Sequence, residues 1–481
     1  MSGEKKEGSS LWRELSGKRT LRELFRAIPE QIPAKAAAAL LCVLTALPLL
    51  AAVLIPRDED LSIWCISLHV LIKNVGYLGI IAAAFSALWD KYNRENRAGG
   101  FLFKLRQNGL WIFLLAMLFW SVLSTVFSTN PGVSFFGDSY RKDGLVSYFA
   151  YAGIFAAAIK LRNRRHIKLI LNIFVSSASV LALLGLLNIP AVNEYLFINP
   201  GDSVFCNPNH YGYYICMSIM SAVLLCSSNG ADGCGKKKKA LFFVIHAAEL
   251  VLLANALIAC KTLGSLLAVI VALIALVALS LFAVRKRFWH VLIAAALIFA
   301  SAGISSAGVW DMKAESTRLF TDISTVYDAI SGEQVDEEAL NAVGSVRGLF
   351  FRNAVKFIGE RPVFGYGPDN LGERYRESGI TTNDRPHNEV VQFASSLGIP
   401  AAVFYLLAMF FHLLMFIKKF RRLDIVTLCA YAAVGAYLVS SLFGNTMFYT
   451  TPYYFMLLGI SYALIKNLGC ESIIVVKNSR A

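Results

Sequence analysis

The sequence LGSLLAVIVALIALVALSLFAV occupies residues 263–284 and contains no charged residue. An α-helix needs about 20 apolar residues to cross the roughly 30 Å hydrocarbon core of a membrane, and this run is long enough. Eleven further runs of similar character lie on either side of it. We therefore expect an all-α, polytopic membrane helix bundle of about 12 transmembrane helices, at residues 34–56, 62–89, 108–128, 145–161, 167–188, 210–228, 240–260, 263–284, 288–309, 397–417, 424–444 and 450–466.

The composition of the whole chain agrees with this class. Of its 481 residues, 56% are hydrophobic and only 16% are charged, which excludes a soluble globular protein of this size. A net charge of +14 is also found in nucleic-acid-binding proteins, but here the basic residues lie in short loops between the spans. In such loops they set the orientation of the chain and contact anionic lipid, so we expect membrane lipid and no nucleic acid as partner.

The basic residues also predict the topology. Alternate connections are rich in Lys and Arg, among them 236–239 and 418–422, whereas the connections between them are not. Because basic loops stay in the cytoplasm, we expect a multi-pass protein of a cytoplasmic membrane with both termini inside. The predicted parts are a basic N-terminal tail at 1–33, spans 1–9 within 34–309, one large extracytoplasmic loop at 310–387, spans 10–12 within 388–466, and a C-terminal tail at 467–481.

The large loop carries helical patterns of its own. Phe350, Ala354 and Ile358 recur at every fourth position beside a row of charged residues. This spacing predicts an amphipathic helix, lying against the outer leaflet or across the bundle, or else packed within a small external domain. The acidic stretch at 328–338 is expected to be solvated, and residues 387–397 to form a short helix before the tenth span.

Four polar patches face outside on this topology. They are RKDGL at 141–145, FCNPNH at 205–210, Arg347 followed by ERPVFGYGP at 360–368, and RPHN at 385–388. Guanidinium groups bind phosphate through paired, charge-assisted hydrogen bonds, and an imidazole exchanges protons near neutral pH. Their combination at the mouth of a membrane bundle favours transfer of a phosphate-linked group over simple binding.

The order of these patches resembles a known family. Arg-x-x-Gly-Leu, Phe-x-Asn-Pro-Asn, Arg followed by Pro-x-x-Gly-x-Gly-Pro, and His-Asn in a large outer loop are similar to the O-antigen ligase and O-antigen polymerase family, over residues 129–466. The resemblance implies a bacterial glycosyltransferase of the GT-C type that is metal-independent and uses no cofactor. Such an enzyme moves a saccharide from a polyprenyl-diphosphate-linked donor to an acceptor hydroxyl at the outer face of the inner membrane.

The chain departs from the family pattern at two places. The pattern runs from His387-Asn388 over nine residues to Gly398, but Ala401 occupies its final position. The family's Ser-Arg-Gly at the start of a middle span has Leu263 in place of the arginine. Lys261 is the nearest substitute cation, although lysine is a point charge and lacks the bidentate fork of arginine.

The chemistry assigns roles to individual residues. Negative charge grows on a diphosphate as it leaves, and guanidinium groups stabilise that charge without a metal. Arg347 and Arg361 are the candidate catalytic arginines, and His387 is the candidate general base, oriented by Asn388 or an outer carboxylate. The alternatives are a lipid-headgroup anchor for each arginine and a structural role for the histidine. Substrate-binding roles are expected for Arg141, Asn207, Asn209, His210, Lys261 and Asn388.

Other interpretations stay open at this point. Asp58-Glu59-Asp60 offers an alternative metal or base site. Lys73 and Glu249 fall inside predicted spans, where charge is costly, and we expect them to face each other. If they instead line a path, the alternative function is a transporter or flippase for lipid-linked or polysaccharide substrates. The motifs do not separate ligase from polymerase, or a glycan from a lipid or protein acceptor.

Overall fold

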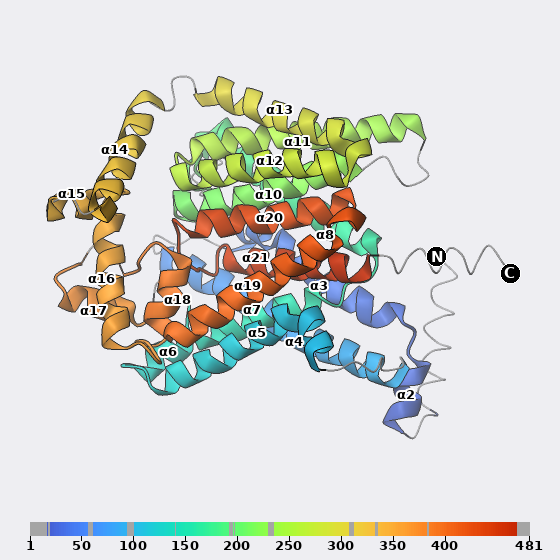
Figure 1. The fold of residues 1–481 in the computed structure, drawn as a ribbon. Coiled ribbons are helices and arrows are strands. Elements are labelled where there is room, and N and C mark those ends of the chain that lie inside the picture. Colours follow the sequence, from blue (N-terminus) through green and yellow to red (C-terminus); the bar gives the residue numbers. More distant parts are fainter. Residues whose placement is uncertain are drawn as a thin grey trace.

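A computed structural model describes residues 17, 20–55, 61–93, 101–139, 141–191, 196, 198–228, 235–306, 312–331, 335–381 and 384–468. Among these residues the regular secondary structure is helical, with no β-strand. The long helices lie side by side in one bundle (Figure 1). The predicted all-α class is therefore confirmed.

Each predicted span falls on a helix. The twelve are α3 (Gln31–Leu54), α4 (Leu61–Asn93), α5 (Phe101–Val126), α7 (Leu145–Ala158), α8 (Arg164–Leu187), α10 (Pro208–Ser228), α11 (Lys236–Ala259), α12 (Leu263–Ala283), α13 (Phe288–Ser306), α19 (Ile399–Lys419), α20 (Ile425–Ser441) and α21 (Thr451–Asn467).

Length and composition support a membrane bundle. Nine helices within the described ranges are long and apolar enough to cross a membrane, while α7 and α20 are apolar but shorter. The protein is thus a multi-pass membrane protein. The number of twelve crossings remains a prediction.

The centre of the bundle is built around α10. This helix is buried along its length and packs on α8, α11, α12 and α20. Near it, α21 packs on α7 and α20, and its residues are also almost all buried. At the edge, α12 packs on α20, and α19 packs mainly on α5. This arrangement leaves α12 and α19 on either side of α20.

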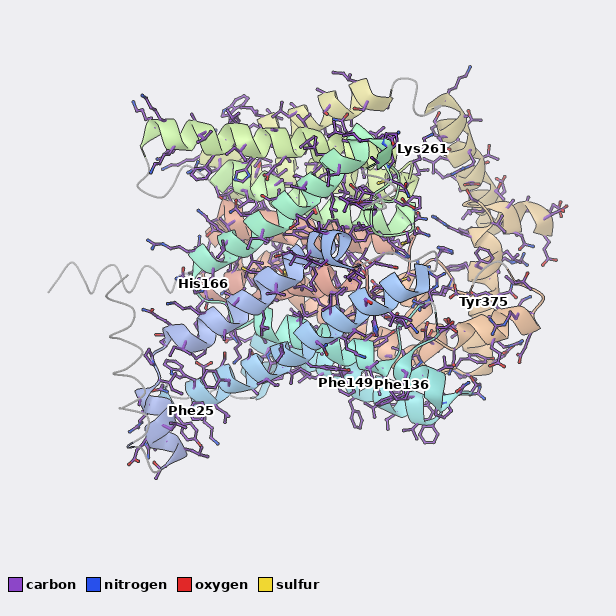
Figure 2. All side chains as sticks on the ribbon, turned by 180° about the vertical axis from the view of Figure 1, so that it is seen from behind. Phe25, Phe136, Phe149, His166, Lys261 and Tyr375 are labelled. Carbon is purple, nitrogen blue, oxygen red and sulfur yellow. The ribbon has the colours of Figure 1, made fainter. Side chains whose placement is uncertain are left out.

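One end of the bundle, which we call the loop end, carries most of the remaining helices. They are α6 (Pro131–Phe136), α14 (Met312–Ser331), α15 (Glu337–Ala342), α16 (Arg347–Glu360), α17 (Leu371–Glu377) and α18 (Glu389–Leu397). Figure 1 shows α14 and α16 running across the ends of the bundle helices, with α2 (Leu21–Ala27) at the opposite end. Figure 2 shows the same division: Lys261 and Tyr375 lie toward the loop end, and Phe25 and His166 lie at the other end.

The predicted amphipathic helix is present as α16, and it lies across the bundle. It buries Phe350, Ala354 and Phe357, so Phe357 takes the place that the pattern assigned to Ile358. The predicted short helix before the tenth span is α18. The long helix α14 was not predicted, because its acidic and hydroxyl side chains mask an apolar row that includes Leu319, Ile323 and Val326.

The predicted pairing of Lys73 with Glu249 is wrong. Glu249 accepts a hydrogen bond from Ser176 Oγ at 3.0 Å and contacts His246 Nδ1 at 2.6 Å. Lys73 lies on α4, which packs on α3 and α7, whereas α11 with Glu249 packs on α8, α10 and α13. The two charges therefore lie in different parts of the bundle.

Candidate functional site

A cavity of about 640 Å³ lies at the loop end. Its walls are the first turns of α10 and α12, one side of α14, and the turn that precedes α16. Three residues predicted from sequence, Asn209, Lys261 and Arg347, come from separate segments and line this one space. Among the described residues no carboxylate pairs with Lys261 or Arg347, whereas Arg318 in the same wall pairs with Glu315 at 3.2 Å. Asp322 also lines the space, so three cations face two carboxylates, and the cavity carries a net positive charge that suits an anion.

The Asn-Pro-Asn turn presents Asn209 to the cavity. Helix α10 begins at Pro208, and Asn207 Oδ1 accepts the Asn209 N–H at 2.9 Å. Asn207 is thus the residue that caps the helix, which leaves the Asn209 side chain available for another contact. Its Oδ1 accepts a hydrogen bond from Arg347 Nη2 at 3.4 Å.

Arg347 is positioned by an unusual stretch of backbone. Gly344, Ser345 and Val346 have φ values of +64°, +60° and +71°, so three consecutive residues are left-handed. Glycine adopts this conformation freely, but a β-branched valine does so at a cost of about 1–3 kcal/mol. Asp322 Oδ2 on α14 accepts the Gly344 N–H at 3.1 Å and holds the turn. The chain thus aims the first side chain of α16 into the cavity.

His387 lies beside the same turn of α16. Its ring is 5.8 Å from the ring of Phe350, which is one helical turn after Arg347. Its backbone is also left-handed, with φ of +55°. Burial, followed by the charges of Arg347 and Arg141, lowers the pKa of His387 to about 4. The imidazole is therefore neutral at physiological pH, as a general base must be.

Asn445, which the sequence analysis missed, orients this imidazole. Its Oδ1 accepts the His387 backbone N–H at 2.9 Å, and its Nδ2 lies 3.3 Å from His387 Nδ1. An amide NH₂ only donates, so Nδ1 accepts and the neutral ring carries its proton on Nε2. In this tautomer Nε2 is a donor. Nε2 can accept a proton only in the other neutral tautomer, in which Nδ1 carries the ring proton and donates it to the oxygen of an Asn445 amide that has turned over.

A buried ionic network holds the segment around His387 in place. Arg385 Nη1 donates to Asp143 Oδ2 at 3.1 Å and to the Thr446 carbonyl at 2.6 Å, and Nη2 donates to Asp369. Asp369 Oδ2 also accepts the Asp143 N–H at 3.0 Å. Asp369 directly follows the glycine-rich motif at 360–368. The motif therefore positions a carboxylate that holds the segments of the loop end together. Because Asp143, Asp369 and Thr446 lie far apart in the sequence, no local pattern predicts that they bind Arg385.

Arg141 is bound to a carboxylate. Its guanidinium makes two hydrogen bonds to Asp384, at 2.7 and 2.6 Å, and this pairing lowers the pKa of Asp384 although burial opposes it. Arg141 is close enough to His387 to act on its pKa. Arg141 is therefore placed to act on His387 through its charge, whereas its N–H donors are already bound to Asp384.

Two other predicted residues have structural partners. Asn388 caps α18 by accepting the Val391 N–H at 3.1 Å, and its Nδ2 donates to the Leu442 carbonyl at 3.2 Å. His210 is buried in α10 and packs 5.8 Å from the ring of Tyr449. Its Nδ1, however, has no hydrogen-bond partner in the part of the chain that the structure describes.

Arg361 lies away from the cavity. It follows the last residue of α16, and the 14 residues of that helix separate it from Arg347 by roughly 20 Å. Its guanidinium is 5.2 Å from the Tyr366 ring and donates to the Phe127 carbonyl at 3.5 Å. The structure therefore does not bring Arg361 and Arg347 together.

The acidic sequence after α3 is the alternative candidate for a metal or base site. Asp58, Glu59 and Asp60 lie outside the described residues. Within the described ranges, no group of three or more His, Cys, Asp and Glu side chains is arranged to hold a metal ion.

These observations define the class: a multi-pass helical membrane protein with a cationic cavity and a neutral histidine at one end. A family model described as O-antigen ligase matches residues 248–406, from α11 into α19. Over this segment the chain is thus similar to the O-antigen ligase family, which supports the resemblance that its motifs predicted. The matched segment contains Lys261, Arg347 and His387, whereas the Asn209 side of the cavity lies before it. No curated protein matches the chain.

Proposed function

We propose that the protein transfers a saccharide from a polyprenyl-diphosphate-linked donor to an acceptor hydroxyl at the outer face of a bacterial cytoplasmic membrane. The observation that carries this proposal is the cavity that unites Arg347, Lys261 and Asn209 beside His387. An O-antigen ligase domain implies a lipid-linked glycan substrate, and a cationic cavity at the end of a membrane bundle fits its diphosphate.

The donor diphosphate lies against Arg347 and Lys261 in this proposal. Arg347 offers a planar pair of N–H donors to the phosphate oxygens, and Lys261 adds a point charge two residues before Leu263, which stands where the family has arginine. Because charge builds on the diphosphate as the glycosidic bond breaks, both contacts strengthen in the transition state. This stabilisation requires no metal ion and no cofactor.

His387 acts on the acceptor hydroxyl as general base. Burial, followed by the positive charges around it, lowers the pKa of His387 and keeps the imidazole neutral before substrate binds. A bound diphosphate offsets those charges, which raises the pKa of His387 and makes it a stronger base once the donor is in place. For this role the neutral ring carries its proton on Nδ1 and donates it to the Asn445 amide oxygen after the amide turns over. Nε2 then accepts the proton of the acceptor hydroxyl, whose oxygen attacks the anomeric carbon as the polyprenyl diphosphate leaves. The acceptor is a hydroxyl of a glycan, lipid or protein.

The test is transfer by the purified protein in liposomes. The assay follows release of polyprenyl diphosphate from a saccharide-linked donor, with EDTA present and with Arg347→Ala as the inactive control. We expect transfer in EDTA and none with Arg347→Ala. Loss of transfer in EDTA, with recovery on adding a divalent cation, would move the site to Asp58, Glu59 and Asp60.

The proposed side of the membrane has a separate test. Single cysteines at Lys237 and Lys286 are expected to react with an impermeant reagent only from the cytoplasm. Cysteines at Asp202 and Glu337 are expected to react only from outside. Cytoplasmic labelling at Glu337 would overturn the outer-face site.

A further inference from the structure

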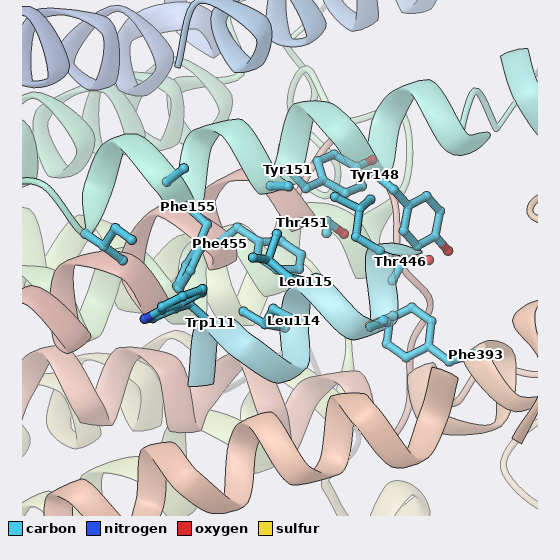
Figure 3. Close-up of a pocket in the computed structure, with 15 residues that line it drawn as sticks. Trp111, Leu114, Leu115, Tyr148, Tyr151, Phe155, Phe393, Thr446, Thr451 and Phe455 are labelled. Carbon is cyan, nitrogen blue, oxygen red and sulfur yellow. The ribbon is translucent and has the colours of Figure 1, made fainter. Parts of the chain in front are cut away.

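Helix α5 has one face inside the bundle and one face outside it. Figure 3 shows Trp111 and Leu114 turned toward Tyr151 of α7, and these residues line an apolar crevice. Phe119 and Val126 do not belong to that lining and are 63% and 64% exposed. On a transmembrane helix, exposed apolar side chains contact the hydrocarbon of the lipid. The outer face of α5 is therefore a lipid-facing surface that continues to the last residue of the helix.

A short loop after α16 lies at the end of this surface. Trp120 Nε1 on α5 donates to the Val363 carbonyl at 3.0 Å. The Pro362 carbonyl accepts the N–H of Ile399, the first residue of α19, at 2.8 Å. Pro362 and Val363 are thus fastened to two membrane helices, close to the point where α19 begins. This is the level of the lipid headgroups on the loop side of the membrane.

Three aromatic rings are stacked at this level. The Phe364 ring lies 5.5 Å from the Trp120 ring and 4.5 Å from the Phe127 ring, at interplanar angles of 16° and 25°. We call these three residues the aromatic cluster. Phe127 is 55% exposed, and Phe136 nearby in sequence is 66% exposed. Amphipathic aromatic side chains are enriched at the headgroup level of membranes, where this cluster lies.

Beside the cluster lies a cation that carries no carboxylate. Arg361 is exposed, its guanidinium is 5.2 Å from the Tyr366 ring, and it donates to the Phe127 carbonyl. Its neighbour Glu360 binds Arg374 instead, at 2.7 and 3.0 Å. Within the described ranges no other carboxylate forms an ion pair with Arg361 either. This surface therefore offers a planar fork of N–H donors to a phosphate, and its nearest carboxylate is already bound.

We propose that Arg361 and the aromatic cluster bind the headgroup of an anionic phospholipid in the outer leaflet. The guanidinium binds the phosphate, and the rings lie at the boundary between the glycerol and the acyl chains. An anionic lipid is preferred to a zwitterionic one, because Glu360 is bound to Arg374 and does not attract an ammonium group. Since α16 separates Arg361 from Arg347, this lipid and a molecule in the cavity occupy different sites.

The test is photocrosslinking in liposomes that contain equal amounts of phosphatidylglycerol and phosphatidylcholine. A photoreactive residue replaces Val363, which is 48% exposed, and mass spectrometry identifies the crosslinked lipid. We expect phosphatidylglycerol to be crosslinked about fivefold more often than phosphatidylcholine, because one arginine near a membrane surface favours an anionic lipid by about that factor. Arg361→Gln should abolish this preference, and Arg361→Lys should retain most of it because the charge is kept.

Arg376→Gln is the matched control. Arg376 is also exposed, but it lies on α17, which is farther from the bundle than α18 (Figure 1). This variant should leave the lipid preference unchanged. Equal crosslinking of the two lipids by the protein with Arg361, or an undiminished preference in Arg361→Gln, would overturn the assignment. Absence of any lipid crosslink at position 363 would place the loop away from the membrane and would overturn it as well.

Discussion

Helix α16 has Arg347 at its first residue and Arg361 just after its last, and the two ends differ in backbone conformation and in what surrounds each guanidinium. At the Arg347 end, three left-handed residues direct a guanidinium into a cavity that also contains Lys261 and Asn209. At the Arg361 end, the guanidinium lies on the surface over the Tyr366 ring. Sequence motifs treat the two arginines alike. The structure places Arg347 in the cavity and Arg361 outside it, so only Arg347 is in position to contact a molecule bound there.

The largest expected effect concerns His387, which belongs to the Arg347 end. His387→Ala should lower transfer by about 10²–10⁴-fold while leaving donor binding nearly intact, since a positioned general base contributes that much. His387→Asn is the matched variant, because asparagine tolerates the left-handed backbone but takes no proton at neutral pH. Full activity in both variants would return His387 to a structural role.

A smaller effect is expected at Asn445, which orients the imidazole. Asn445→Leu should lower turnover by about tenfold, because the ring loses its only side-chain hydrogen-bond partner within the described residues. Asn445→Asp should retain more activity, because a carboxylate accepts from Nδ1–H and leaves Nε2 free to accept a proton. Turnover measured at saturating donor separates the two variants. If Asn445→Asp is the more damaging change, His387 acts as a hydrogen-bond donor and is not the base.

The pH dependence of stability and of activity tests the Arg347 end of α16 in a further way. The pKa of His387 is lowered from 6.5 to about 4, so the folded protein binds fewer protons than the unfolded chain between these values. Its contribution to stability is present above pH 6.5 and is lost as pH falls toward 4. For activity, the acid limb of kcat/KM should lie near pH 4 and that of kcat at higher pH, because bound diphosphate offsets Arg347. Acid limbs that coincide would argue against a diphosphate beside His387.

Much of the fold could be predicted because the membrane imposes a simple rule. Runs such as 263–284 must be helical, since no water is present to satisfy their backbone groups. The placement of Asn445 beside His387 could not be predicted, because 58 positions and three α-helices, α18, α19 and α20, separate them. The same holds for the distance between Arg347 and Arg361, which depends on α16 continuing without interruption from one to the other. Local patterns thus identified candidate residues, and packing determined which of the candidates lie close together.

The central claim is that the Arg347 end, and not the Arg361 end, binds the donor diphosphate. Its most direct test is the Kd of undecaprenyl diphosphate for the purified protein and for Arg347→Lys and Arg361→Lys, measured in EDTA. Both variants keep the positive charge and lose the bidentate fork. We predict that Arg347→Lys weakens binding about tenfold and that Arg361→Lys leaves it unchanged. Equal Kd values for Arg347→Lys and the unaltered protein, or a larger loss in Arg361→Lys, would contradict the account.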